Sequence, residues 1–160
     1  MKVAIFDIDG VIAEVSERLR ATLQEIHTED LRKIPKEKRK DFWRIFLSPR
    51  YMNLDKPIME NIEYIRRCKE KGVKIILITG RREDTQKEQT IEQLNKWNVP
   101  YDKIYFRRRG DLRRDIQYKI SIIKRMIKKG LEITEVWDDN REIIDKIKEK
   151  FPTIKVRYIG

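Results

Sequence analysis

Short apolar runs alternate along the chain with longer segments whose apolar residues recur at helical spacing. The runs predict five strands, at 2–7, 73–78, 103–106, 133–137 and 154–159. The longer segments predict four helices, at 57–71, 84–97, 115–129 and 141–150. Pro57 near the start of the first helix and Gly72 after its end are typical helix boundary signals. This alternation favours the Rossmann-like α/β class, in which helices cover both faces of a parallel five-stranded sheet.

One stretch departs from the alternation. Residues 15–55 show helical periodicity, with Leu19 and Leu23 on one face, but contain no strand-like run. We therefore expect a small helical cap inserted after the first strand, and a core domain made of 1–14 and 56–160. Because ligands of open α/β sheets bind beyond the carboxyl ends of the strands, a cap leaving from that edge would cover the site.

Acidic and hydroxyl side chains follow three of the predicted strands. Asp7 and Asp9 end the first strand, Thr79 follows the second, and Asp138 and Asp139 follow the fourth. Any one of them could be an ordinary turn or helix-cap residue. The carboxyl ends of parallel strands share one edge, however, so these side chains should meet there. Crowded carboxylates repel one another, and a hard cation with oxygen ligands relieves the repulsion, which makes Mg²⁺ the expected cofactor.

The overall charge adds a possible class of partner. Lys and Arg number 38 against 27 Asp and Glu, a net charge of +11 that attracts polyanions such as nucleic acids. A composition rich in charged residues, as in heat-adapted proteins, is the alternative explanation. Arginine runs lie at 107–109 and 113–114. They could bind along a nucleic-acid backbone, or they could belong to a solvated loop. Phe42, Trp43 and Phe46 could stack on bases, but we expect them to fill the core of the cap.

The cysteine content and the hydropathy of the chain indicate in which compartment it works and whether it crosses a membrane. The chain has one cysteine, Cys68, which forbids an intrachain disulfide and suits a reducing compartment. The apolar start of the chain is too short for a signal peptide, and no run approaches the roughly 18 apolar residues that indicate a spanning helix. We therefore expect a cytoplasmic protein with no membrane partner. With one histidine as well, a zinc cluster is not expected.

Four motifs in order resemble those of the haloacid dehalogenase (HAD) superfamily. They are Phe6-Asp7-Ile8-Asp9-Gly10-Val11, Ile78-Thr79-Gly80, Lys119 and Trp137-Asp138-Asp139. The resemblance implies the HAD fold and a Mg²⁺-dependent phosphohydrolase. Asp7 would attack phosphorus to form an aspartyl-phosphate, and Asp9 would act as general acid and base. Thr79 would bind the transferring phosphoryl group, and Lys119 would neutralise its charge.

The same resemblance implies a set of metal ligands. Mg²⁺ would be held by Asp7, by the backbone carbonyl of Asp9 and by an acid of the fourth motif. Asp139 is preferred as the direct ligand and Asp138 as its close support, with the reverse assignment left open.

The stretch 101–119 carries a closer resemblance. Tyr101-Asp102-Lys103-Ile104-Tyr105-Phe106-Arg107, then Arg109-Gly110-Asp111-Leu112-Arg113-Arg114-Asp115 and Lys119, is similar to the phosphatase domain of phage-type polynucleotide kinase-phosphatases. That family removes 3′-phosphates from nucleic-acid ends. The resemblance implies that Arg18 and Arg81 grip the substrate phosphate, beside Gly80, and that Asp115 supports Lys119 and the metal site.

We therefore expect a phosphatase whose substrate is a phosphorylated nucleic-acid end. A phosphatase of nucleotides or other small phosphate esters is the alternative, because the residues from about 19 to 55 form a longer insert than that family leads us to expect. A non-catalytic nucleic-acid-binding module is a third hypothesis. The chain has no GxxxxGK[ST] phosphate loop, so any kinase half is absent or a separate chain, and a separate kinase or ligase is a partner to consider.

Overall fold

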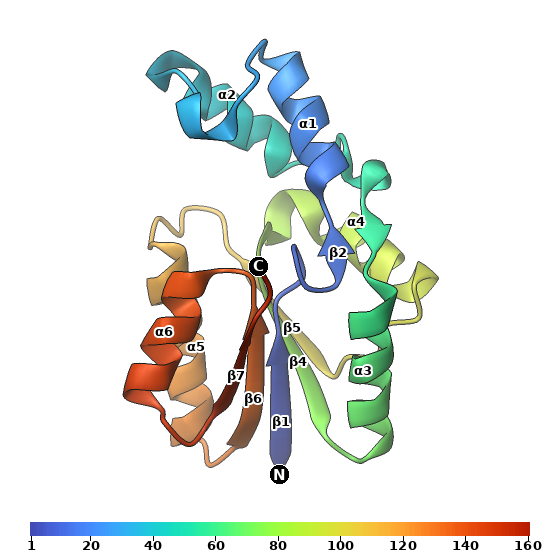
Figure 1. The fold of residues 1–160 in the computed structure, drawn as a ribbon, viewed down its shortest axis with the longest axis vertical. Helices are drawn as coiled ribbons and strands as arrows, with labels where there is room; N and C mark the ends of the chain where they lie inside the picture. Colours follow the sequence, from blue (N-terminus) through green and yellow to red (C-terminus); the bar gives the residue numbers. More distant parts are fainter.

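The computed structural model describes residues 1–160 and centres on one parallel sheet (Figure 1). Its five strands lie in the order β5-β4-β1-β6-β7, and every pairing is parallel. The strands are β1 (Lys2–Phe6), β4 (Lys74–Arg82), β5 (Lys103–Arg107), β6 (Glu132–Asp138) and β7 (Lys155–Tyr158). The predicted α/β class with a five-stranded parallel sheet is confirmed, and β1, the first strand of the chain, lies at its centre.

Four helices cover the two faces of this sheet. They are α3 (Met59–Glu70), α4 (Glu83–Lys96), α5 (Asp115–Lys128) and α6 (Arg141–Lys150). In Figure 1, α3 and α4 lie on one side of the sheet, and α5 and α6 on the other. Because side chains alternate along a strand, Ala4 and Phe6 of β1 join the core under α3 and α4. Val3 and Ile5 join the core under α5 and α6.

Two short strands were not predicted from the sequence. β2 (Ala13–Glu14) pairs antiparallel with β3 (Lys56–Pro57), so the chain leaves the core and returns to it side by side. The prediction that Pro57 begins the following helix is wrong, because it lies in β3 and α3 begins at Met59. Two-residue strands are too short to produce a periodic signal. β4 also runs beyond the predicted end of its strand, through to Arg82.

Between β2 and β3, the chain forms helices that lie beyond the carboxyl ends of the sheet strands (Figure 1). They are α1 (Ser16–Glu25) and α2 (Lys36–Phe46), with short 3₁₀ turns at Leu31–Lys33 and Met52–Leu54. Leu23, Ile26, Phe42 and Ile45 form a small core of their own. The division into 15–55 as cap and 1–14 with 56–160 as core stays a prediction. No helix of the structure has the length and apolar character needed to cross a lipid bilayer.

Candidate active site

The ends of β1, β4 and β6 bring the predicted acids into one cleft. β4 and β6 flank β1, so the residues at the ends of these strands are neighbours, although Asp7 of the first and Asp138 of the last are more than a hundred positions apart. Carboxylate oxygens of Asp7, Asp138 and Asp139 all lie within 4.8 Å of one another. They adjoin a cleft of about 600 Å³ roofed by α2. Its lining residues are Asp7, Asp9, Trp43, Phe46, Leu47, Gly80, Arg82, Arg107, Asp111, Leu112, Asp115, Lys119 and Asp139.

Lys119 is the cation at the centre of this cluster. It lies one turn into α5, and its Nζ is 2.7 Å from Asp138 Oδ2, 3.2 Å from Asp7 Oδ1 and 3.8 Å from Asp115 Oδ2. Burial opposes its charge, but the carboxylates of Asp7 and Asp138 outweigh burial and raise the pKa of Lys119. The ammonium group therefore stays charged at any physiological pH.

Asp7 sits at the inner end of the cleft. It is almost fully buried, and its Oδ1 accepts a hydrogen bond of 2.8 Å from the backbone N–H of Ile8. Burial raises the pKa of Asp7 well above its usual range, and the charges of Asp138 and Asp139 act in the same direction against Lys119. A carboxylate in this environment is short of positive charge, which a bound cation would supply.

The two acids at the end of β6 differ in their partners. Both oxygens of Asp138 are engaged, Oδ2 by Lys119 and Oδ1 by the backbone N–H of Asn140 at 2.9 Å. Asp139 lies at the surface of the cleft and forms no ion pair, with its carboxylate turned toward Gly10. Partial burial of that carboxylate and the charge of Asp138 raise the pKa of Asp139 to about 6. Asp139 is thus the acid of this pair with oxygens available to a ligand.

Asp9 is held by two buried arginines. Its Oδ1 accepts hydrogen bonds from Arg81 Nη2 at 2.7 Å, Arg81 Nε at 2.9 Å and Arg18 Nη2 at 3.0 Å. Burial raises the pKa of Asp9, but the Arg81 and Arg18 guanidinium groups outweigh it and hold this pKa below its usual range. Both arginines, each 1 % exposed, also bind Asp55 at 3.1 Å. Both guanidinium groups face Asp9 and Asp55 and do not line the cleft.

Asp55 was not identified from the sequence. It lies just before β3, is buried, and links Arg18 of α1 to Arg81 of β4. Its Oδ2 also accepts a hydrogen bond of 3.1 Å from Gln93 of α4. No local pattern marks this aspartate, because its partners are 26 or more positions away. The network connects both ends of the 15–55 segment to Asp9.

The remaining predicted residues lie around the same cleft. Thr79 is buried, and its hydroxyl accepts a hydrogen bond from the backbone N–H of Arg81 at 3.1 Å. Gly80 lines the cleft, and a Cβ at this position would lie 3.6 Å from Asp115 Oδ1. Asp115 also forms an ion pair of 3.5 Å with Arg107. The structure therefore brings together all the acids and basic residues that the motifs indicate, with Arg18, Arg81 and Thr79 in the wall rather than in the open space.

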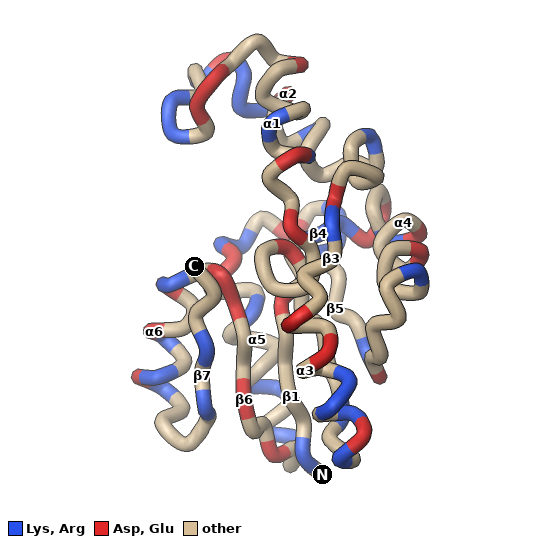
Figure 2. Tube along the Cα trace, turned by 45° about the vertical axis from the view of Figure 1, so that its right-hand side comes forward, with Lys and Arg blue, Asp and Glu red and all other residues tan.

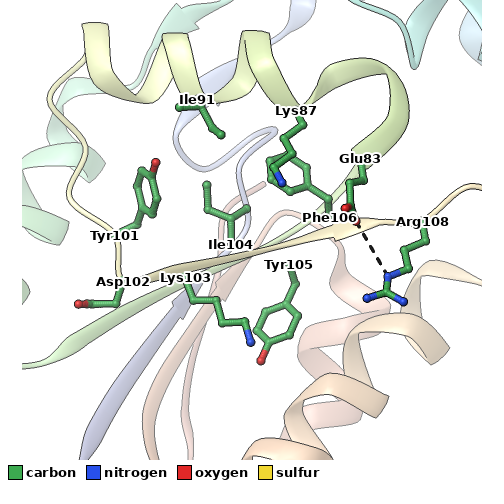
Figure 3. Close-up of a pocket in the computed structure, with 10 residues that line it drawn as sticks. All are labelled: Glu83, Lys87, Ile91, Tyr101, Asp102, Lys103, Ile104, Tyr105, Phe106 and Arg108. Carbon is green, nitrogen blue, oxygen red and sulfur yellow. Dashed lines mark ion pairs between the residues drawn. The ribbon is translucent and has the colours of Figure 1, made fainter.

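A second hollow lies away from the acid cluster, between α4 and the edge strand β5 (Figure 3). Ile104 and Phe106 point toward α4 there, and Lys103 and Tyr105 point to the other side of the strand. None of the predicted site residues lines this hollow. Basic residues are spread over the helices and strands rather than gathered at one place (Figure 2).

The three aromatic residues of α2 differ in how exposed they are. Phe42 is buried in the small core formed with Leu23, Ile26 and Ile45, as expected, and Phe46 packs against that core. Trp43 is 52 % exposed and lines the cleft, so the expectation that all three fill the core is wrong for this residue. Position 43 lies at the margin of the face of α2 that packs on Leu23 and Ile26, which explains its exposure.

Comparison with known proteins shows the family. The model of the "Polynucleotide kinase PNKP phosphatase domain" matches residues 36–156, which is most of the chain. No curated protein matches this sequence. Two solved structures of a Pnkp1/Rnl/Hen1 complex, described in one case as an RNA repair complex, are similar with TM-scores of 0.70 and 0.72 at 19% and 20% identity. They cover 99% of this chain, which spans only 45% and 42% of theirs.

A third similar structure is a class C acid phosphatase from Bacillus anthracis, solved with tungstate bound. Its TM-score is 0.64 at 14% identity, covering 99% of this chain and 66% of that one. At such identities the structural likeness shows a shared fold, while the family model covers Thr79, Lys119 and Asp138 but not Asp7 or Asp9. The chain belongs to the PNKP phosphatase domain family and is a phosphatase domain of the HAD superfamily.

Proposed function

We propose that this domain removes 3′-phosphates from nucleic-acid ends and that Asp7 is its nucleophile. The observation that carries the proposal is the position of Asp7, whose carboxylate faces the cleft 3.2 Å from Lys119 Nζ and beside Asp139. Membership of the PNKP phosphatase family supports the nucleic-acid substrate. The net charge of +11 supports a polyanionic partner in the same way.

The proposed reaction has two displacements. A carboxylate oxygen of Asp7 attacks phosphorus, the bond to the ester oxygen breaks, and an aspartyl-phosphate forms. Water then attacks the phosphorus, which frees inorganic phosphate and restores the carboxylate. Asp9 donates a proton to the departing ester oxygen in the first step and accepts one from water in the second.

The arginines must release Asp9 for this role. While Arg18 and Arg81 bind its carboxylate, they keep the pKa of Asp9 low and therefore oppose its protonation. We infer that an incoming phosphate draws both guanidinium groups to its own oxygens, since arginine pairs well with phosphate. The pKa of Asp9 then rises, because its two cationic partners turn away while its carboxylate stays partly buried. Substrate binding would in this way prepare the acid.

The remaining residues hold the transferring group. Lys119 offsets the negative charge that gathers on the phosphoryl oxygens and keeps Asp7 oriented. Thr79 and the backbone at Gly80 supply hydrogen bonds from the end of β4. Asp115 steadies Lys119 from one turn earlier on α5, at 3.8 Å. All these groups belong to strands or helices, so they are positioned before substrate arrives.

The donor set fits a hard divalent cation. Asp7, Asp138 and Asp139 offer oxygen ligands only, within 4.8 Å, and Lys119 pairs with Asp7 and Asp138 but not with Asp139. We propose that Mg²⁺ is held by Asp7, Asp139 and the backbone carbonyl of Asp9, with Asp138 in support. When bound, the cation supplies positive charge for the phosphate oxygens and relieves the repulsion among the acids.

We also infer a partner for the domain. The chain spans less than half of the similar chains from the Pnkp1/Rnl/Hen1 complex, so the remaining activities of such a system would come from other chains or segments. A separate ligase or kinase that acts on the dephosphorylated end is the class of partner that we propose. Residues 15–55 are proposed as the cap that selects the substrate, since α2 roofs the cleft.

Phosphate release from matched oligonucleotides tests the proposed function. Oligonucleotides of one sequence with a 3′-phosphate, a 5′-phosphate or none are compared, each with Mg²⁺ and with chelator. We expect release from the 3′-phosphate with Mg²⁺, and none from the Asp7→Asn variant. Asp145→Asn, which alters an exposed ion pair on α6, is the matched control and should retain full activity.

Two results would replace the proposal with its alternatives. Turnover of nucleoside monophosphates or p-nitrophenyl phosphate alone would indicate a phosphatase of small esters. Oligonucleotide binding without turnover of any ester would indicate a binding module.

A further inference from the structure

The cleft has two exposed apolar side chains on its walls. Trp43 of α2 is 52 % exposed, and Leu112 of the loop between β5 and α5 is 94 % exposed. The other two tryptophans, Trp97 and Trp137, are only 9 % and 4 % exposed. Scattered apolar residues are normal on a protein surface, but these two come from different elements and line the same cleft as Asp7.

Aromatic neighbours hold the Trp43 ring in place. Phe42 and Phe46 each meet it edge-on, with ring centroids 5.0 and 6.3 Å away. Phe46 in turn lies under the guanidinium of Arg18, 4.6 Å from its ring centroid, and Arg18 binds Asp9. The indole is therefore supported from the small core of α1 and α2 and connected through Phe46 and Arg18 to Asp9, while about half of its surface stays exposed.

We propose that Trp43 stacks on the base of the nucleotide that carries the phosphate to be removed. This inference rests on the proposed function, and it identifies the base of the terminal nucleotide as the part of the substrate that the same cleft recognises. A base has a flat π-face that stacks on tryptophan, and Leu112 offers an apolar contact from a second element. The cleft volume of about 600 Å³ suits one nucleotide placed beside Asp7. Every base can stack, so recognition is tolerant of sequence but requires a base.

A thermodynamic cycle with one change in the protein and one in the substrate measures this contact. Trp43→Ala and the wild type are compared on two 3′-phosphorylated oligonucleotides, one complete and one abasic at its terminal nucleotide. We expect Trp43→Ala to lower kcat/KM on the complete substrate about 5- to 150-fold, the range that stacking of one base confers. Removing the base should cost the wild type a similar factor, and making both changes should cost little more than either one alone.

Two variants serve as controls. Trp43→Phe keeps an aromatic face and should recover much of the loss. Tyr158→Ala removes another exposed aromatic, on the far edge strand β7 and outside the cleft, and should behave like wild type on both substrates. Equal kcat/KM for Trp43→Ala and wild type on the complete substrate would overturn the proposal. So would additive losses in the cycle, which would mean that indole and base act independently.

Tryptophan fluorescence tests the contact without turnover. Because Trp97 and Trp137 are buried, a 3′-phosphorylated oligonucleotide added to the inactive Asp7→Asn variant should quench Trp43 chiefly. The abasic oligonucleotide, or a background of Trp43→Phe, should remove this quenching, and its persistence in either case would refute the stacking. This result separates the two proposals: quenching without any phosphate release by wild type would defeat the proposed reaction and leave the base contact standing. Release with no quenching would do the opposite.

Discussion

Gly10→Ala is the substitution whose effect the structure defines most closely. Gly10 has φ of +86°, and a Cβ there would lie 2.3 Å from Asp139 Oδ2 and 2.7 Å from Asp139 Cγ. Real Cβ atoms essentially never come within 3.0 Å of another atom, so Asp139 must move. Its side chain is at the surface and can rotate away. The stability cost is then mainly backbone strain, about 1–2 kcal/mol, while the larger effect falls on the proposed metal site.

Gly72→Ala separates strain from displacement. Gly72 has nearly the same conformation, with φ of +84°, but a Cβ there would meet nothing within 4 Å. Both variants should lower Tm by about 2–8 °C in chelator, from the strain and the usual 2–4 °C for each kcal/mol in a domain of this size. Only Gly10→Ala should also need more Mg²⁺ for half-maximal phosphate release, by about tenfold or more. Equal Mg²⁺ requirements in the two variants would refute the placement of Asp139 at the metal.

Three further predictions concern charged side chains. Lys119→Met leaves Asp7 and Asp138 without their shared cation, so urea unfolding should show a loss of about 3–5 kcal/mol, and an unchanged midpoint would contradict it. Asp7→Asn removes a buried charge whose pKa is raised chiefly by burial, so thermal unfolding in chelator should come no earlier than in wild type although turnover is lost. Asp102→Asn tests pH dependence: burial raises the pKa of Asp102, but the bond from Lys69, at 2.6 Å, and others hold it below its usual value. The folded state therefore releases this proton more readily, so the stabilisation is present at neutral pH and lost as pH falls below about 3.9. Thermal unfolding at pH 7 should give wild type a free energy of unfolding about 1 kcal/mol or less above that of Asp102→Asn. A difference that does not disappear in acid would refute the assignment.

The sequence by itself determined the framework of this protein. Strand β1 and helix α5 could be predicted because the buried positions of an element recur at a regular spacing. That spacing is visible in a short stretch of the sequence. The acids at strand ends could be placed together because parallel strands share an edge, which is a property of topology rather than of side-chain detail. The family resemblance is confirmed by the family match, which covers Thr79, Lys119 and Asp138 but not Asp7, while the role of each residue stays a prediction.

Tertiary structure decided the features that depend on distant partners. Asp9 and Arg81 are 72 positions apart, and Arg18 and Asp55 are 37 apart, so no window of sequence contains both members of either pair. The exposure of Trp43 likewise depends on how α2 packs against α1 and over the cleft. Periodicity identifies an apolar face, but whether a side chain at its margin is covered depends on the neighbour that folding brings. Ion pairs and exposed surfaces depend on which distant segments folding brings together, and for that reason they could be seen only in the folded molecule.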